Sequence, residues 1–289
     1  MIRFIARLNL VLIFCCSMST LGCAEENSGS DERFSIFFQN QNRFVHVHVP
    51  EGYTGEHPVP LVIALHGAGD SGGNFQKGAG LDKQADKHGF IVAYPSASGS
   101  NWAEGCNCNR PDIDGVDDVG FTDEVVNLIN EKYSIDENRK FVIGFSQGGL
   151  FAQRLACERS GEYRAFSTVA AMISEPLSLV CRPPNPVNML MINGSADSVL
   201  PFHGIPSGSF ATKSAYQTLI MWKERNACSG QIETEVYRPR GPLTKLHTAA
   251  GCRGNADIRL YEIVEGGHEW PRGGVDSPAL ITAFFGLSQ

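Results

Sequence analysis

The chain has 289 residues, of which 42% are hydrophobic, and this is enough to bury the core of one large domain. Its net charge of -7 at pH 7 comes without a basic stripe or a cluster of lysine and arginine. We therefore expect no nucleic-acid partner. A small, neutral or weakly charged substrate fits this composition better.

Residues 1–24 are predicted to be an export signal rather than part of the fold. Two arginines flank an apolar run that is too short to span a membrane comfortably and that ends in small residues. The sequence TLGC favours a bacterial lipoprotein signal over residues 1–22, with a lipid on Cys23 as a membrane anchor. Ordinary cleavage after Ala24 is the alternative. Either route predicts an exported chain that is secreted, periplasmic or lipid-anchored to the bacterial envelope.

A polar linker at 25–33 leads into two alternating segments, RFSIFFQN and RFVHVHVP, which predict an antiparallel hairpin turned at 40–42. Helical stretches such as 123–132 and 211–225 then alternate with apolar runs: PLVIALHG, FIVAYPS, KFVIGFS, AFSTVAAM, VNMLMING and IRLYEIVEGG. Continuous apolar runs between helices are typical of a parallel sheet covered on both faces. The predicted fold class is α/β: one α/β-hydrolase domain over 34–286, with a mostly parallel sheet and the N-terminal hairpin.

The segment FVIGFSQGGLFAQRLAC places the pattern GxSxG between an apolar run and a helical one. The pattern alone is weak, but strand, tight turn and helix form the context in which a serine hydroxyl is exposed on a strained turn. Gly144 and Gly148 leave room for the strand and the helix to approach closely. Ser146 is therefore predicted to be a nucleophile.

An acid and an imidazole follow two later apolar runs, and sites in open sheets lie at the carboxyl ends of strands. Asp197 follows VNMLMING, and His268 lies in GGHEWP after the last run. Serine, aspartate and histidine in this order match the α/β-hydrolase triad. His268 is predicted to be the general base and acid, and Asp197 to hold its tautomer. His203 competes for the base role but lies in the loop of the acid.

Backbone N–H groups of Ala68 and Gln147 are predicted to bind the oxyanion of the tetrahedral intermediate. Ala68 lies in the glycine-rich HGAGDSGG after His66, and Gln147 begins the helix after the nucleophile. Trp102 and Trp270 are interpreted as an aromatic wall that contacts substrate, although burial in the core is the commoner fate of tryptophan. His66 is placed with these contacts, with a hydrogen-bonded structural role as its alternative.

Six cysteines follow the predicted signal: Cys106, Cys108, Cys157, Cys181, Cys228 and Cys252. In an exported chain disulfides are the default. Topology favours a bridge from Cys157 to Cys181 and another from Cys228 to Cys252. The remaining two cysteines are either joined in a tight ring or free. Their CxC pattern has no second Cys or His pair at zinc spacing, so no metal and no cofactor is predicted.

These motifs resemble an esterase family that includes secreted polyhydroxybutyrate depolymerases, feruloyl esterases and related bacterial lipoprotein esterases. The resemblance covers about 43–285 and rests on PLVIALHGAGDSG, YPSASGSNW, VDDVGF, GFSQGGLFAQRLAC, LPFHG and GGHEWP. It assigns Ser146, Asp197 and His268 as the triad and implies ester hydrolysis through an acyl-enzyme. The expected substrates are feruloyl or acetyl esters of plant polysaccharide. The alternatives are a short-chain polyester depolymerase and, in another class, a non-catalytic surface protein that binds carbohydrate.

Overall fold

The computed structural model describes residues 29–238, 241–271 and 275–288. The predicted export signal at 1–24, with Cys23, lies outside these residues. None of the helices in the described ranges is long and apolar enough to cross a membrane.

The described chain forms one mixed sheet with the strand order β1-β2-β4-β3-β5-β6-β7-β10-β9-β8. The strands are β1 (Ser30–Phe38), β2 (Gln41–Val49), β3 (Val59–Leu65), β4 (Ile91–Pro95), β5 (Ile135–Phe145), β6 (Ala165–Val169), β7 (Met189–Gly194), β8 (Ile232–Tyr237), β9 (Thr244–Ala249) and β10 (Ile258–Ile263). The helices are α1 (Gly72–Ala79), α2 (Leu81–His88), α3 (Arg110–Ile113), α4 (Asp118–Lys132), α5 (Gln147–Glu158), α6 (Glu175–Val180), α7 (Ala215–Arg225) and α8 (Ser277–Phe284), with 3₁₀ turns at Ser98–Ser100 and Arg253–Asn255.

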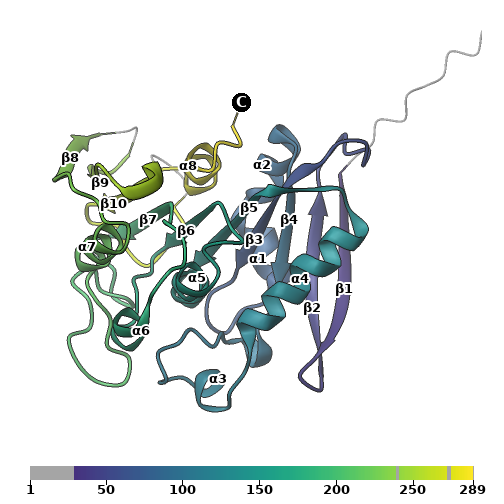
Figure 1. The fold of residues 1–289 in the computed structure, drawn as a ribbon, viewed down its shortest axis with the longest axis horizontal. Helices are drawn as coiled ribbons and strands as arrows, with labels where there is room; N and C mark the ends of the chain where they lie inside the picture. Colours follow the sequence, from purple (N-terminus) through teal and green to yellow (C-terminus); the bar gives the residue numbers. More distant parts are fainter. Residues whose placement is uncertain (1–28, 239–240, 272–274, 289) are drawn as a thin grey trace, which may run out of the picture.

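The central strands from β4 to β10 pair in parallel, and antiparallel strands flank them on both sides. Figure 1 shows the β1–β2 hairpin at one edge and β8 with β9 at the other. The predicted mostly parallel sheet with an N-terminal hairpin is confirmed. The strands β8 and β9 were not expected. β8 is an edge strand with mostly exposed side chains, two of them glutamates, and β9 is TKLHTA, so neither gives an apolar run.

Alternate side chains of the buried strands face two separate hydrophobic clusters. In β3, Leu61, Ile63 and Leu65 pack with α4, α5 and α7 on one face, whereas Val62 and Ala64 pack with α1, α2 and α8 on the other. Side chains alternate between the faces of a strand, so a strand covered on both faces is apolar throughout. The predicted helices on both faces of the sheet are confirmed by these two clusters.

The N-terminal hairpin starts earlier than its sequence predicts, so the linker at 25–33 is too long. β1 begins at Ser30, and its first residues pair with the end of β2, with Ser30 opposite Val49. The polar start of this edge strand hides it from a search for apolar alternation, because its side chains are exposed. Its turn is formed by Gln39 and Asn40, which both have positive φ, as the two-residue turns favoured in hairpins require.

A buried histidine connects the hairpin to α2. His48 lies in β2 and is 7% exposed. Its Nδ1 is 2.8 Å from Oδ1 of Asp31 in β1, and its Nε2 is 2.8 Å from Oδ1 of Asp86 in α2. Both ring nitrogens donate to carboxylates only when the imidazole is protonated. The charged form of His48 therefore ties three elements together.

This arrangement predicts a pH-dependent contribution to stability. Burial lowers the pKa of His48, but hydrogen bonds with Asp31 and Asp86 outweigh it, so the pKa lies above its ordinary 6.5. Such a contribution is complete below the unfolded pKa and is lost as the pH rises through the folded one. We expect His48→Gln to lower the free energy of unfolding in urea more at pH 6 than at pH 9, whereas the exposed His57→Gln serves as control. Equal losses at both pH values would contradict this prediction.

Candidate active site

Ser146 occupies a strained turn between β5 and α5. Its φ of 52° and ψ of -122° lie in a region that residues other than glycine rarely adopt. A Cβ on Gly144 would lie 2.1 Å from the carbonyl oxygen of Gly148, and one on Gly148 would lie 2.3 Å from that of Leu65. These glycines are required by close packing of α5 against β5 and β3. The turn lifts the Ser146 hydroxyl to the carboxyl edge of the sheet.

A continuous chain of hydrogen bonds links Ser146 to the loops after β7 and β10. The Nε2 atom of His268 is 2.9 Å from Oγ of Ser146, and its Nδ1 is 2.8 Å from Oδ2 of Asp197. The other oxygen of Asp197 accepts the backbone N–H groups of Val199 and Leu200, each at 2.8 Å. A carboxylate fixed in this way accepts a hydrogen bond from Nδ1–H, which keeps the ring proton on Nδ1 and leaves Nε2 free to accept the serine proton.

His203, the competing base on sequence grounds, does not take this place. It is exposed in the loop after Asp197, and its ring lies against Phe202. The imidazole that reaches both Ser146 and Asp197 is that of His268.

The loop after β3 lies beside the serine, as an oxyanion loop requires. A Cβ placed on Gly67 would be 3.4 Å from the Cβ of Ser146. The next residue, Ala68, is exposed, and Gly69 has a φ of +75° that turns the chain. Gln147 is the first residue of α5, where backbone N–H groups have no acceptor within the helix. The loop that contains Ala68 and the first turn of α5 thus both lie next to Ser146.

The predicted substrate contacts of His66 and Trp102 are wrong, because both side chains are 0% exposed. His66 bonds the carbonyl of Gly67 through Nδ1 and accepts the N–H of Ala97 at Nε2. Trp102 donates its indole N–H to the carbonyl of His66, and its ring stacks on Phe151 at 5.0 Å. A large ring with a satisfied N–H belongs in the core. His66 and Trp102 therefore hold the backbone of the loop after β3 in place from the protein core.

Trp270 is partly buried, and it is connected to His268 through the ring of Phe145. Its indole N–H donates to the carbonyl of Ala79, and its ring meets those of Phe75 and Phe145 edge to face. The ring of Phe145 is in turn 5.4 Å from that of His268. Sequence reasoning missed Phe145, although it directly precedes Ser146 in GxSxG.

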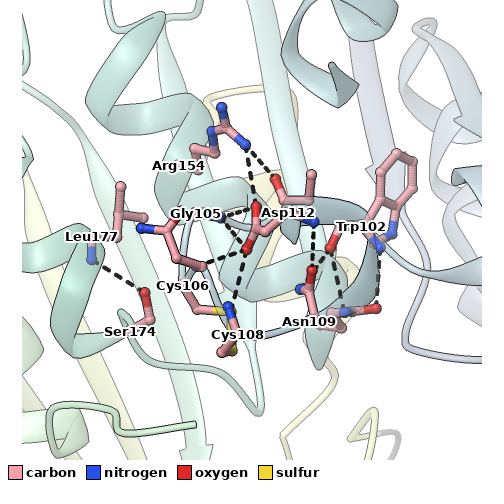
Figure 2. Close-up of a disulfide and its surroundings, with 12 residues drawn as sticks. Trp102, Gly105, Cys106, Cys108, Asn109, Asp112, Arg154, Ser174 and Leu177 are labelled. Atoms are coloured by element: carbon pink, nitrogen blue, oxygen red, sulfur yellow. Dashed lines mark hydrogen bonds and ion pairs between the residues drawn. A yellow bond between two sulfur atoms is a disulfide. The ribbon is translucent and has the colours of Figure 1, made fainter. Parts of the chain in front are cut away.

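The structure contains both disulfides expected from the topology, Cys157 to Cys181 and Cys228 to Cys252. It also joins Cys106 to Cys108, which is the tight-ring alternative. Figure 2 shows this small ring in the loop between β4 and α4, next to Asp112.

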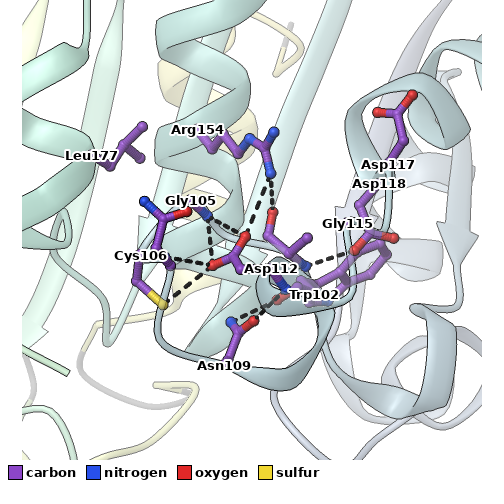
Figure 3. Close-up of polar contacts among 12 residues, drawn as sticks. Trp102, Gly105, Cys106, Asn109, Asp112, Gly115, Asp117, Asp118, Arg154 and Leu177 are labelled. Atoms are coloured by element: carbon purple, nitrogen blue, oxygen red, sulfur yellow. Dashed lines mark hydrogen bonds and ion pairs between the residues drawn. The ribbon is translucent and has the colours of Figure 1, made fainter. Parts of the chain in front are cut away.

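The carboxylate of Asp112 organises the loop around that ring. It accepts the backbone N–H groups of Gly105 and Asn107 at 3.0 to 3.1 Å. Arg154 of α5 lies 3.7 Å from it and donates to the carbonyl of Ala103. Figure 3 shows Asp112 between the loop backbone and the Arg154 guanidinium. The loop is thus fixed to α5, the helix that follows Ser146.

Ser146 lies on a strained turn after a central parallel strand, and an imidazole and a carboxylate reach it from later strand ends. This arrangement defines the class of α/β-hydrolases. The model of a family described as "Putative esterase" matches residues 38–240, which is more than half of the chain. The protein belongs to this esterase family.

The chain is similar in sequence to two named esterases. "Putative esterase NocK" from Nocardia uniformis subsp. tsuyamanensis is 28% identical over 230 residues, 74% of this chain and 66% of that protein. "Feruloyl esterase B" from Piromyces equi is 26% identical over 237 residues, 78% of this chain but 42% of that protein. The alignments thus span less than two thirds of either relative.

Among solved structures, the chain is similar to an acetyl xylan esterase from Aspergillus awamori. The TM-score is 0.66 at 16% sequence identity, and the match covers 89% of this chain and 99% of the other. At this identity the likeness shows the shared fold.

Proposed function

We propose that the protein hydrolyses carboxylic esters through a serine acyl-enzyme. The observation that carries this proposal is the hydrogen-bonded chain from Ser146 through His268 to Asp197. A serine hydroxyl becomes a competent nucleophile only when a neighbouring base accepts its proton. The strained backbone at Ser146 supports the same role, because strain of this kind is found at functional sites.

In the first half-reaction the Ser146 oxygen attacks the ester carbonyl carbon, and its proton moves to Nε2 of His268. The bond between the carbonyl carbon and the leaving oxygen then breaks, and the alcohol takes that proton. Water repeats the sequence on the acyl-enzyme, which releases the carboxylic acid and restores the serine. The N–H groups of Ala68 and Gln147 would stabilise the oxyanion, each contributing about 3 kcal/mol.

The proposed substrates are feruloyl or acetyl esters of plant polysaccharide. One relative is named a feruloyl esterase, and a protein of similar fold is named an acetyl xylan esterase. The partly exposed ring of Phe145 lies beside His268, and the ring of Trp270 packs against it, so the two provide an apolar surface suited to an aromatic acyl group.

The experiment that tests this function compares three substrates and one covalent probe. We expect a fluorophosphonate to label the protein, and methyl ferulate or an acetylated xylan to be hydrolysed faster than amorphous polyhydroxybutyrate. Faster release of hydroxybutyrate would favour the polyester alternative. Absence of labelling together with absence of hydrolysis would favour the carbohydrate-binding alternative.

Trp270→Ala is expected to lower kcat/KM for methyl ferulate about fivefold relative to p-nitrophenyl acetate. Loss of one ring contact costs about 1 kcal/mol, which corresponds to this factor. Trp270→Phe should keep most of the preference, and the distant, exposed aromatic Tyr216→Ala serves as control. If Trp270→Ala changes both substrates by the same factor, the ring does not contribute to selectivity.

We also propose export from the cell and a single catalytic domain. Three disulfides support export, because disulfides persist in oxidising compartments. The two hydrophobic clusters that share the central sheet support one domain.

A further inference from the structure

One buried acid has no part in the triad. Glu104 lies in the loop between β4 and α4 and is 4% exposed. One of its carboxyl oxygens lies within 4.8 Å of the sulfur atoms of Cys106 and Cys108. Its Oε2 has no hydrogen-bond partner among the described residues. An ionised carboxylate that is buried and incompletely paired is costly, so the site favours the neutral acid.

The environment of Glu104 agrees with this conclusion. Burial raises its pKa to about 8, hydrogen bonds with Gln147 and Asn109 oppose the rise, and the negative charge of Asp112 adds to it. Charged groups on the neighbouring elements are paired with other residues. Arg154 of α5 bonds Ala103 and faces Asp112, and the buried Asp118 of α4 pairs with Arg43 of β2.

The partners of Glu104 hold the backbone behind the nucleophile. The side chain of Gln147 accepts the N–H of Trp102 at 3.2 Å and donates to the carbonyl of Trp102 at 3.4 Å. Asn109 donates to the same carbonyl at 3.0 Å. Figure 2 shows Asn109 and Trp102 in contact at the base of the loop. Glu104 therefore bonds both amides that fix the Trp102 backbone.

Gln147 connects this network to the chemistry. It directly follows Ser146, and its backbone N–H is one of the two groups assigned to the oxyanion. We propose that Glu104 is a positioning residue for the oxyanion hole, which as a neutral acid orients the Gln147 side chain and so fixes the first turn of α5. This inference rests on the proposed esterase function.

Ionisation of Glu104 would oppose catalysis through its charge. It places a negative charge in a low-dielectric region behind the group that stabilises the developing oxyanion. The turnover number should therefore fall as the pH rises through the pKa of Glu104.

The test measures kcat and KM for p-nitrophenyl acetate between pH 6 and 9.5, with spontaneous hydrolysis subtracted. We expect the wild-type kcat to fall above about pH 8. Glu104→Gln, which keeps an amide but cannot ionise, should abolish this fall and retain most of the activity at pH 7. Glu104→Ala should lower kcat about 10-fold with a smaller change in KM, because displacement of a catalytic group is costly. The exposed Glu124→Gln serves as control.

Thermal melting of each Glu104 variant shows whether a loss of kcat comes from unfolding or from the proposed positioning role. Glu104→Gln with the same alkaline fall as the wild type would overturn the proposal. So would a wild-type kcat that does not change between pH 7 and 9, whether or not the variants fold. An inactive wild-type protein would overturn the esterase function and this inference with it, whereas an active protein with a pH-independent kcat would overturn only the role of Glu104.

Discussion

Replacing Ser146 with alanine is expected to lower kcat for p-nitrophenyl acetate roughly 10⁶-fold, which is the scale at which loss of a serine nucleophile disables a triad. The removed oxygen is the one that lies 2.9 Å from Nε2 of His268. The turn between β5 and α5 sets the position of this hydroxyl. The variant should also lose labelling by a fluorophosphonate.

The fold should tolerate this substitution. Alanine is smaller than serine and adopts positive φ no less readily, so Ser146→Ala should melt within a few degrees of the wild type. Ser198→Ala, an exposed serine in the loop after β7, is the matched control and should keep full activity and labelling. Retention of more than about a hundredth of the wild-type kcat by Ser146→Ala would contradict a role as nucleophile.

The meeting of Ser146, Asp197 and His268 at one edge of the sheet was predictable because the signals are local. Each side chain follows an apolar run, and the carboxyl ends of parallel strands share one edge. The strands themselves are recognisable because burial on both faces removes polar residues from them.

Whether each tryptophan side chain is fully buried or partly exposed depends on tertiary structure. Trp102 and Trp270 both follow predicted strand ends, and the sequence does not distinguish them. Trp102 is buried because a carbonyl of the neighbouring loop accepts its indole N–H and Phe151 covers its ring. The role inferred for Glu104 was equally hidden, since glutamate in a loop normally lies in water. Only the packing of this loop against α5 removes it from solvent.

The start of β1 and the strand β8 escaped prediction because their side chains lie in water. The first residues of β1 and most of β8 expose their side chains, so they carry no hydrophobic pattern. Their pairing depends on backbone hydrogen bonds with a neighbouring strand, which nearly every residue type can form, so the sequence carries little signal for it.

Asp197→Asn is expected to lower kcat about 10⁴-fold at neutral pH, a loss typical of an inverted histidine tautomer. The two carboxyl oxygens of Asp197 are not equivalent. Oδ1 accepts the N–H groups of Val199 and Leu200, whereas Oδ2 faces Nδ1 of His268. In the asparagine variant the carbonyl oxygen must remain at the two N–H groups, because an amide nitrogen there would meet two donors.

The NH₂ group of the asparagine then points at His268. It donates to Nδ1, so the ring proton moves to Nε2, and an Nε2 that carries a proton cannot accept one from Ser146. The variant should therefore fold with wild-type thermal stability and bind substrate with a similar KM, while its turnover fails. The exposed Asp114→Asn is the control and should keep full activity. A loss of less than about tenfold in Asp197→Asn would mean that this carboxylate does not determine the tautomer of the base.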